Sequence, residues 1–424
     1  MKFILIIVCF LFVNTSASAD SYIKANAYLD VKSGKLVEPA NILIKDGKIS
    51  AINPESIPQD IKVIELKGQI LLPGLMDMHT HLDLDYSDGF GKIITHESAS
   101  KGAIRATKNA EKTLMAGFTT VRNVGQVHIT GELIGVALSE AEQEGWIVSP
   151  RIIPAGHMVT ISGGHADLTL GLSENLFEPE PKHGVVNNKD EAIEAVRYQI
   201  KHGAKVIKVH ATAGVMSLED SVGAQQLSDE EMKAIVEEAE RHHTKVAAHA
   251  HGAEGIKAAI TAGVSSIEHG SLLDDEGIRM MKKHNVFLVP TTGLVDFVME
   301  GIDRNDPKIA AKAKYVLPLA KENLSKAIKA GVKIALGTDS PLIPHGDNAH
   351  ELSAMMEQGM SELDAIQSAT INSAELLGVK DRGQIKQGML ADIIAVSENP
   401  LKNIKTLEDV TFVMKGGKVY KRDL

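Results

Sequence analysis

Two histidines separated by one residue end an apolar stretch at residues 72–81 and could bind a metal ion. On a β-strand, residues i and i+2 point to the same face, so the rings of His79 and His81 would converge on one point. Neutral imidazole is a common ligand of divalent metals. Because a chain with 17 histidines contains such pairs by chance, the pair predicts a metal site only if other strands supply more ligands.

Later apolar stretches also end in side chains that could bind a metal. These side chains are Lys208 within residues 206–210, His249 and His251 at the end of 247–251, His269 in 267–270, and Asp339 in 336–340. An unpaired ammonium among apolar residues is costly, which makes Lys208 conspicuous. Together with His79 and His81, these residues form a plausible ligand set for two metal ions. The alternative is a series of unrelated core and loop histidines.

The expected strands alternate with amphipathic helix patterns. We expect strands at 70–78, 118–122, 151–155, 204–209, 245–250, 265–267, 286–289 and 332–336, and helices at 129–143, 228–243, 252–262, 274–284, 308–330 and 350–358. Eight strands in about 300 residues favour an α/β protein with a (β/α)8 TIM barrel, whose sites lie at the carboxyl ends of the strands. A doubly wound sheet is the alternative, but no glycine-rich phosphate-binding sequence follows the first strand.

Both ends of the chain are typical of short strands separated by turns. The stretches are 22–23, 41–45 and 48–52 near the amino end, and 391–396, 410–414 and 418–420 near the carboxyl end. They predict a small β-sandwich domain built from residues 20–70 and 381–424, with the barrel at residues 71–380 between them. Two unrelated terminal hairpins are the alternative.

Residues 1–19 have the features of a signal peptide. Lys2 precedes an apolar run at 3–13, and residues 17–19, Ala-Ser-Ala, have the form of a cleavage site. The apolar run is short for a membrane span, although an anchor is the alternative. The only cysteine, Cys9, lies in this segment, so the mature chain would have no disulfide and no thiolate ligand. We expect a periplasmic or secreted protein without membrane attachment.

The composition is that of a globular protein with an acidic balance. The chain has 424 residues, of which 44% are hydrophobic and 24% are charged, and its net charge is −10. Without a basic run or patch, it is not expected to bind nucleic acid or anionic membranes. We therefore expect its partner to be a small-molecule substrate.

Several segments resemble the strand motifs of the amidohydrolase superfamily. They are LPGLMDMHTH, VIKVHATAG, VAAHAHG, SIEHGS and LGTDS, and the resemblance runs from about residue 22 to the end. The segments FTTVRNVG, SGGHAD, PHGDNA and AIQSAT are most similar to the metal-dependent Xaa-Pro and Xaa-Arg/Lys dipeptidase branch, which is carboxypeptidase-like and which ochratoxinase-type amidases also resemble. The resemblance also implies a homo-oligomer, whose symmetry the sequence does not show.

The resemblance assigns a role to each candidate ligand. His79, His81 and Asp339 would bind one metal, His249 and His269 would bind the second, and an N-carboxylated Lys208 would bridge both. Nitrogen and oxygen ligands without sulfur suit two zinc ions, with manganese or cobalt as alternatives.

The implied chemistry is amide hydrolysis by a metal-bridging hydroxide, because two metals lower the pKa of the water between them. Asp339 would accept the proton and pass it to the leaving amine. His165, in ISGGHAD, would contact the substrate or the oxygen of the intermediate, with a structural loop histidine as the alternative. The expected substrates are dipeptides or N-acyl amino acids. Ochratoxin-type amides, cyclic amides, esters, phosphotriesters, deamination and a non-catalytic binding function are the alternatives.

Other residues are candidates for contacting the substrate. They are Arg122, His210, His251 and His345. Arg122 could bind a carboxylate with its bidentate fork, or it could be a buried ion-pair partner. Glu219 and Asp220 could attract a basic C-terminal residue, or they could be solvated. The sequence does not choose among arginine or lysine, proline and a bulky aromatic residue at that position.

Overall fold

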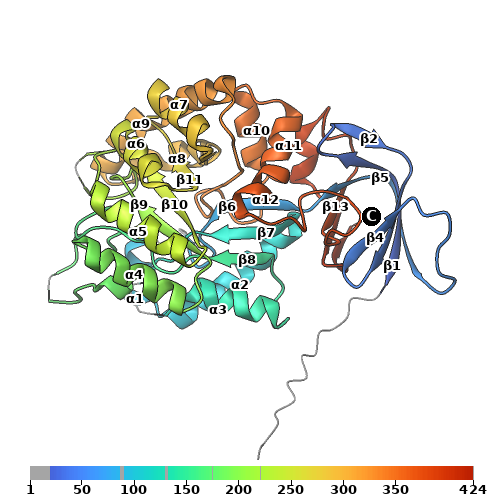
Figure 1. Cartoon of the computed structure of the whole chain (residues 1–424), viewed down its shortest axis with the longest axis horizontal. Helices are drawn as coiled ribbons and strands as arrows, with labels where there is room; N and C mark the ends of the chain where they lie inside the picture. Colours follow the sequence, from blue (N-terminus) through green and yellow to red (C-terminus); the bar gives the residue numbers. More distant parts are fainter. Residues whose placement is uncertain (1–19, 86–89, 129–131, 174, 220, 424) are drawn as a thin grey trace, which may run out of the picture.

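The computed structural model describes residues 20–85, 90–128, 132–173, 175–219 and 221–423. The predicted signal peptide at residues 1–19 and Asp220 lie outside the described residues. A sheet made from both chain ends stands beside a larger part in which strands and helices alternate (Figure 1). Within the described ranges, no helix is both long enough and apolar enough to cross a membrane.

Two parallel sheets form the centre of the larger part. One contains β6 (Leu75–Thr80), β7 (Phe118–Asn123) and β8 (Arg151–Pro154), and the other contains β9 (Val206–His210), β10 (Lys245–Ala250), β11 (Ser266–His269) and β12 (Phe287–Val289). Each strand overlaps a stretch that the sequence predicts as a strand. Because neighbours within each sheet are parallel, their carboxyl ends meet at one edge.

Single parallel bridges connect the edges of these two sheets. Val159, beyond β8, bridges Val209, while Leu288 bridges Ile334 and Thr80 bridges Ser340. The predicted eighth strand at 332–336 therefore contributes one bridge, at Ile334, and no ladder, and the ladders do not run continuously around a closed barrel. Its short apolar run passes directly into Gly337 and the turn that carries Asp339, whose φ of 56° is incompatible with an extended strand.

Helices follow the strands along the chain. They are α1 (Phe90–His96), α2 (Ala99–Met115), α3 (Ile134–Gln143), α4 (Lys189–Lys201), α5 (Asp229–Arg241), α6 (Ala253–Ala262), α7 (Asp275–His284), α8 (Leu294–Gly301), α9 (Pro307–Ala330), α10 (His350–Glu357), α11 (Glu362–Ser368) and α12 (Ile371–Leu377). Helix α5 begins with the predicted cap, because Ser228 accepts from Glu231 N and Glu231 accepts from Ser228 N. The helices that are not among the predicted elements are α1, α2, α4, α8, α11 and α12.

The strands from both chain ends are joined in one sheet. They are β1 (Ser21–Asp30), β2 (Lys35–Val37), β3 (Ala40–Lys45), β4 (Lys48–Ile52), β5 (Lys62–Pro73), β13 (Ile393–Val396), β14 (Phe412–Lys415) and β15 (Lys418–Arg422), in the order β15-β14-β13-β5-β1-β3-β4, with β2 on β1. The antiparallel pair of β13 and β5 unites the two ends. The structure thus has one connected sheet where the sequence predicts a sandwich.

Alternating residues of β13 pack into two different cores. Ile393 and Ala395 face the core of the terminal sheet, whereas Ile394 and Val396 belong to the core of the larger part. Strand β5 ends at Pro73, and β6 begins at Leu75. The terminal sheet therefore leads directly into the strand of His79 and His81, and the predicted boundary at residues 70 and 71 falls within β5.

Candidate metal centre and active site

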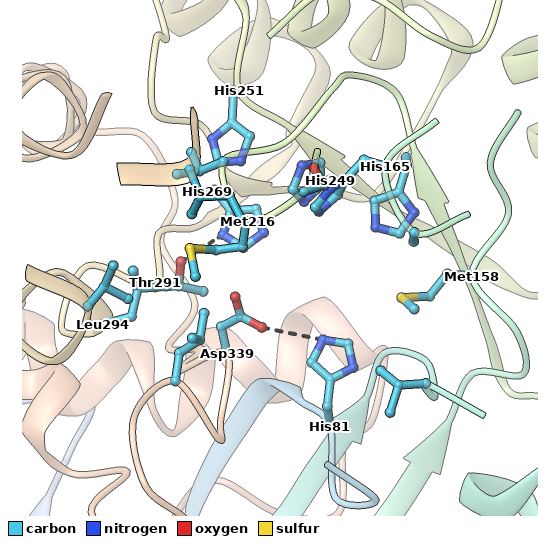
Figure 2. A pocket seen from close by; sticks show the side chains of 18 of the residues that line it. His81, Met158, His165, Met216, His249, His251, His269, Thr291, Leu294 and Asp339 are labelled. Carbon is cyan, nitrogen blue, oxygen red and sulfur yellow. Dashed lines mark hydrogen bonds and ion pairs between the residues drawn. The ribbon is translucent and has the colours of Figure 1, made fainter. Parts of the chain in front are cut away.

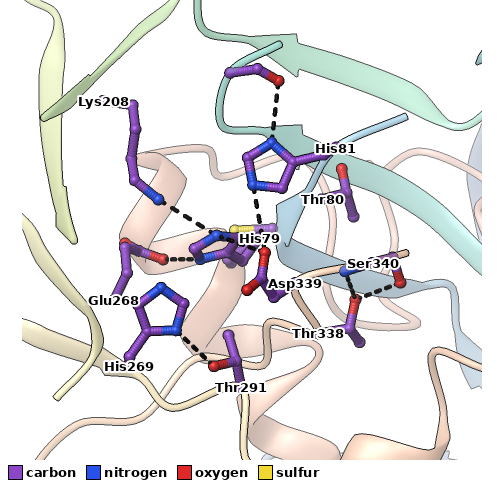
Figure 3. A network of polar contacts seen from close by, with 12 residues as sticks. His79, Thr80, His81, Lys208, Glu268, His269, Thr291, Thr338, Asp339 and Ser340 are labelled. Atoms are coloured by element: carbon purple, nitrogen blue, oxygen red, sulfur yellow. Dashed lines mark hydrogen bonds and ion pairs between the residues drawn. The ribbon is translucent and has the colours of Figure 1, made fainter. Parts of the chain in front are cut away.

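His79 lies in a buried polar network at the carboxyl end of β6 (Figure 3). Its Nδ1 is 2.8 Å from Glu268 Oε2, and its Nε2 is 3.3 Å from Lys208 Nζ and 3.4 Å from Asp339 Oδ1. A carboxylate that accepts from Nδ1–H fixes the tautomer and directs the lone pair of Nε2 toward the site. His79 is therefore oriented as a metal ligand would be.

His79, His81 and Asp339 form a group whose ligand atoms all lie within 4.8 Å of one another. His81 Nδ1 donates to the carbonyl of Gly125 at 3.2 Å, and His81 Nε2 is 3.3 Å from Asp339 Oδ1. Although burial alone would raise the pKa of Asp339, nearby His79 and His81 hold it well below its ordinary value. The group thus offers two imidazoles and one ionised carboxylate, a donor set that fits zinc.

A second group of possible metal ligands consists of histidines at the ends of β10 and β11. His249 lies with His251 and His269 in one cluster, and with His165 and His210 in another. Burial, followed by the nearby charge of His165, lowers the pKa of His249 well below its ordinary value, so its ring is neutral. Its buried Nε2 has no hydrogen-bond partner among the described residues. A buried neutral imidazole with an unpaired nitrogen fits a metal ligand.

Lys208 is only 1% exposed and extends from β9 toward His79 (Figure 3). Burial lowers its pKa to about 8, partly opposed by Glu268 and Asp339. The lowered pKa leaves a larger share of its amine neutral near pH 7, and only a neutral amine can react with carbon dioxide. The predicted carboxylation is thus chemically accessible, and it would explain a lysine among metal ligands.

Left-handed backbone conformations change the direction of side chains just beyond the ends of these strands. His269, Thr291 and Asp339 have φ values of 69°, 51° and 56°, a left-handed region that non-glycine residues rarely adopt. His269 Nδ1 is 2.8 Å from Thr291 Oγ1, which holds the ring (Figure 3). Strained backbone of this kind is concentrated at functional sites. The turns thus place ligands where regular strands would not.

The candidate ligands open into a cavity of about 420 Å³ (Figure 2). His165, His210, His251 and the candidate ligands form its polar wall, and Figure 2 shows His165 beside His249. Aliphatic side chains from other segments also line it, namely Leu168, Leu170, Leu172, Val215, Met216, Leu218, Leu294, Val295, Val298, Ile309, Leu317 and Leu342. A small polar cluster in a mainly apolar cavity is the usual form of a small-molecule site.

Two predicted substrate contacts lie outside this cavity. Arg122 is buried beneath it and donates to Met78 O at 2.6 Å, to Ser266 Oγ at 3.1 Å and to Glu268 Oε1 at 2.8 Å. These partners occupy its guanidinium, so Arg122 is the buried ion-pair partner that the sequence leaves open, and the prediction that it binds substrate is wrong. His345 is also buried without lining the cavity, and its predicted contact with substrate is not supported.

Sequence reasoning missed residues that orient the ligands. Asp77 is fully buried and accepts from His79 N at 2.9 Å and from Thr338 Oγ1 at 2.6 Å, so it fastens β6 to the turn of Asp339. Its position two residues before His79, on the same face of the strand, was the available signal. Glu268, the partner of both His79 and Arg122, lies next to the predicted ligand His269.

Glu219 is mostly buried, with 11% of its side chain exposed, and it is not part of the cavity lining. Its Oε1 accepts from Gly214 N at 2.8 Å and lies 3.5 Å from His165 Nδ1. Burial would raise its pKa, but His165, Ser217 and Gly214 N together lower it to about 2. Ser217 Oγ is 2.7 Å from the same His165 nitrogen. Glu219 and Ser217 thus hold the ring of His165 from behind.

Comparisons with known proteins agree with this geometry. The model of the amidohydrolase family matches residues 70–420. An ochratoxinase of Aspergillus niger is 37% identical over 374 residues, which are 83% of this chain and 76% of the ochratoxinase. The solved structure of a Xaa-Pro dipeptidase with methionine in its active site has a TM-score of 0.90 at 38% identity, over 95% of this chain and 100% of that one.

A prolidase solved in complex with N-methylphosphonate-L-proline has a TM-score of 0.86 at 30% identity, covering 95% of this chain and 100% of that one. The family relation implies that the larger part is a TIM-barrel domain. It also confirms the resemblance to dipeptidases and ochratoxinase. The chain therefore belongs to the amidohydrolase family and is a hydrolase that acts on amide bonds.

Proposed function

We propose that this hydrolase uses two metal ions to cleave the amide bond of N-acyl amino acids or dipeptides that carry an apolar side chain. The main support for this proposal is that the two groups of candidate ligand atoms, around Asp339 and around His249, line one mainly aliphatic cavity. His79, His81 and Asp339 would hold one ion and His249 and His269 the other, with N-carboxylated Lys208 between them. Two divalent ions, zinc by ligand type, would supply an activated water and polarise the substrate carbonyl.

Asp339 and His165 have separate tasks in this proposal. The ionised carboxylate of Asp339 faces the ligand cluster and would take a proton from water and deliver it to the leaving nitrogen. His165 lies across the cluster, with Nδ1 turned toward Ser217 and Glu219. Its Nε2 would therefore stabilise the substrate oxygen as negative charge develops there. His210 and His251 would form the wall around the reacting amide.

The lining of the cavity favours apolar substituents over basic ones. Among the described residues that line it, the two carboxylates are Asp339, which faces the candidate ligands, and Asp167, which accepts from Gly163 N and from Thr169. Neither is placed to receive an arginine or lysine side chain, and burying such a cation without a partner is costly. Aliphatic contacts instead stabilise proline, leucine or an aromatic ring. The named activities of the ochratoxinase and the Xaa-Pro dipeptidase are compatible with this preference.

A matched substrate series tests the proposal. N-acetyl amino acids and dipeptides ending in Phe, Leu, Pro, Arg, Lys or Asp are offered to the metal-loaded mature protein, and released amine is measured together with metal content. We expect cleavage of the apolar members and two metals per chain. Preference for Arg or Lys would overturn the substrate assignment, and cleavage by a protein with one metal would overturn the binuclear assignment. Absence of cleavage in all members would overturn both amide classes.

We further propose that residues 1–19 are removed on export to the periplasm or the cell exterior, and that the mature protein is a homo-oligomer. The apolar run and the Ala17-Ser18-Ala19 site support the first part, and the second is implied by the family resemblance. Amino-terminal sequencing of secreted protein should begin at Asp20. Light scattering that gives the monomer mass would contradict the second part.

A further inference from the structure

A buried lysine on α9 contacts a loop that lines the cavity. Lys312 is 8% exposed, and its Nζ lies 3.1 Å from Gly214 O, 2.6 Å from Ser217 O and 3.0 Å from Glu219 O. An ammonium has three N–H donors, and three carbonyl oxygens of the same loop lie within hydrogen-bond distance of it. We call residues 214–219 the anchored loop.

The carbonyl groups of the anchored loop require a hydrogen-bond donor, and this cation provides it. Three carbonyl oxygens that converge on one point repel one another, and buried carbonyls without a donor are costly. Charge-assisted hydrogen bonds to Lys312 remove both penalties and are stronger than bonds between neutral groups. Without the ammonium, the loop would reopen toward water to satisfy these carbonyls. Lys312 therefore determines whether the loop keeps its shape.

The anchored loop carries the contacts that orient His165. Ser217 Oγ is 2.7 Å from His165 Nδ1, and Glu219 Oε1 is 3.5 Å from it. Gly214 packs against the other side of the ring, because a Cβ at this position would stand 2.4 Å from His165 Cε1. The loop residues whose carbonyls bind Lys312 are thus the same residues that touch His165. Met216 and Leu218 of the same loop also line the cavity.

We propose that Lys312 is a positioning residue for amide hydrolysis, which holds residues 214–219 closed over the cavity and thereby keeps His165 aimed at the substrate oxygen. The inference rests on the proposed function, because it assigns His165 to that oxygen. Lys312 itself touches neither substrate nor metal in this proposal. Its effect passes through Ser217, Glu219 and Gly214.

The test compares Lys312→Met with Lys314→Met. Methionine keeps the length and apolar stem of Lys312 but removes its donors. Lys314, two residues along the same helix, pairs with Asp303 at the surface with 51% of its side chain exposed, so it is the matched control. We expect Lys312→Met to lower kcat/KM for an N-acetyl amino acid by roughly 10- to 100-fold, mainly through kcat. Lys314→Met should match the wild type.

A double-mutant cycle with His165→Asn separates positioning from a general structural effect. If Lys312 acts through His165, adding Lys312→Met to the His165→Asn variant costs little further activity. Equal losses in both backgrounds, or no loss in either, would overturn the proposal. Lys312→Gln, which keeps two amide donors, should recover part of the activity, and it replaces Lys312→Met in every arm if that variant does not fold.

Limited proteolysis provides a readout that needs no substrate. An endoproteinase that cuts after glutamate should cleave at Glu219 faster in Lys312→Met than in Lys314→Met or the wild type, as mass spectrometry of the fragments would show. Equal cleavage rates would overturn the role of Lys312 in holding the loop. If the wild-type protein hydrolyses none of the amides, the proposed function fails while this arm still decides whether Lys312 holds the loop.

Discussion

The base and the rim of the cavity are held in different ways. The base consists of His79, Asp77, Glu268 and Arg122, all at most 2% exposed and connected through several strands. The rim consists of His165 and the anchored loop, outside regular strands and helices, and the His165 side chain is 18% exposed. Several buried side chains hold one another in the base, whereas in the proposal above the rim is held mainly through Lys312. Metal ligation is therefore expected to be rigid, and substrate contact to be adjustable.

The largest expected effect is that of Asp339→Asn, which removes a carboxylate that lies 3.4 Å from His79 of the base. Asparagine cannot accept a proton and is a weaker ligand than a carboxylate, so we expect turnover to fall by about 10²- to 10⁴-fold. Activity is measured together with metal content and unfolding temperature. Asp347→Asn changes an exposed carboxylate eight residues later in the chain and is the control. Near-normal turnover in a metal-replete Asp339→Asn protein would remove Asp339 from proton transfer.

Arg122→Met tests how strongly the buried contacts of the base stabilise the fold. The change leaves Glu268 buried without its cation, which should destabilise the fold by about 3–5 kcal/mol. Denaturant unfolding measures the loss. Arg197→Met is the comparison, because Arg197 is 61% exposed and its partner Glu238 also pairs with Arg241, so this change should destabilise the fold far less than Arg122→Met does. Similar losses for both variants would contradict the contrast between base and surface.

Gly214→Ala tests the rim directly. The new Cβ would displace the His165 ring, which lies 2.4 Å from that position, and we expect a roughly 10- to 100-fold loss of kcat/KM with little change in metal content. Gly301→Ala is the control, because its added Cβ would meet only the flexible end of Arg304 at 3.3 Å. Loss of metal together with activity in Gly214→Ala would show that base and rim are not separable.

A pH-dependent effect on stability is expected for Glu351, which accepts from Thr292 N and Gly293 N beside the cavity. Burial raises its pKa from 4.5 to about 8. The folded state therefore keeps a proton that the unfolded state loses, and this contribution to stability is complete below pH 4.5 and lost as the pH rises toward 8. The slope is at most about 1.4 kcal/mol per pH unit.

Glu351→Gln removes this titration. Its amide oxygen keeps one of the two hydrogen bonds while its amide nitrogen faces the other donor, so we expect lower stability at acid pH but a flatter dependence between pH 5 and 8. Urea unfolding of both proteins at several pH values gives the comparison. Parallel curves for wild type and variant would mean that Glu351 is already ionised across this range in the folded protein.

The difference between base and rim also explains what the sequence could predict. His79, His81, Lys208 and His249 follow strand periodicity, so their convergence could be inferred from spacing. The role of Arg122 could not, because a guanidinium fork suits a substrate carboxylate and Glu268 equally well. The contact of Lys312 with the anchored loop joins residues almost 100 positions apart through backbone carbonyls, which leave no trace in side-chain patterns.

The same difference between local patterns and long-range contacts decides which parts of the fold could be predicted. Strand β10 has the bounds that the sequence predicts, because a buried parallel strand is a continuous apolar run. The predicted eighth strand makes one bridge, because the turn at Gly337 and Asp339 ends it in a way that hydrophobicity does not reveal. The single sheet of the chain ends depends on the pairing of β5 with β13, about 320 residues apart, and local patterns do not encode such pairing.

The position of β6 has a consequence for biosynthesis. Its backbone bonds to late parts of the chain, since Met76 N donates to Ala369 O, Met78 N donates to Leu336 O and Asp339 N donates to His79 O. A ribosome that has translated His79 and His81 must therefore add about 260 more residues before Asp339 exists to complete their group. An interrupted translation product would therefore contain His79 and His81 without the carboxylate that completes their group.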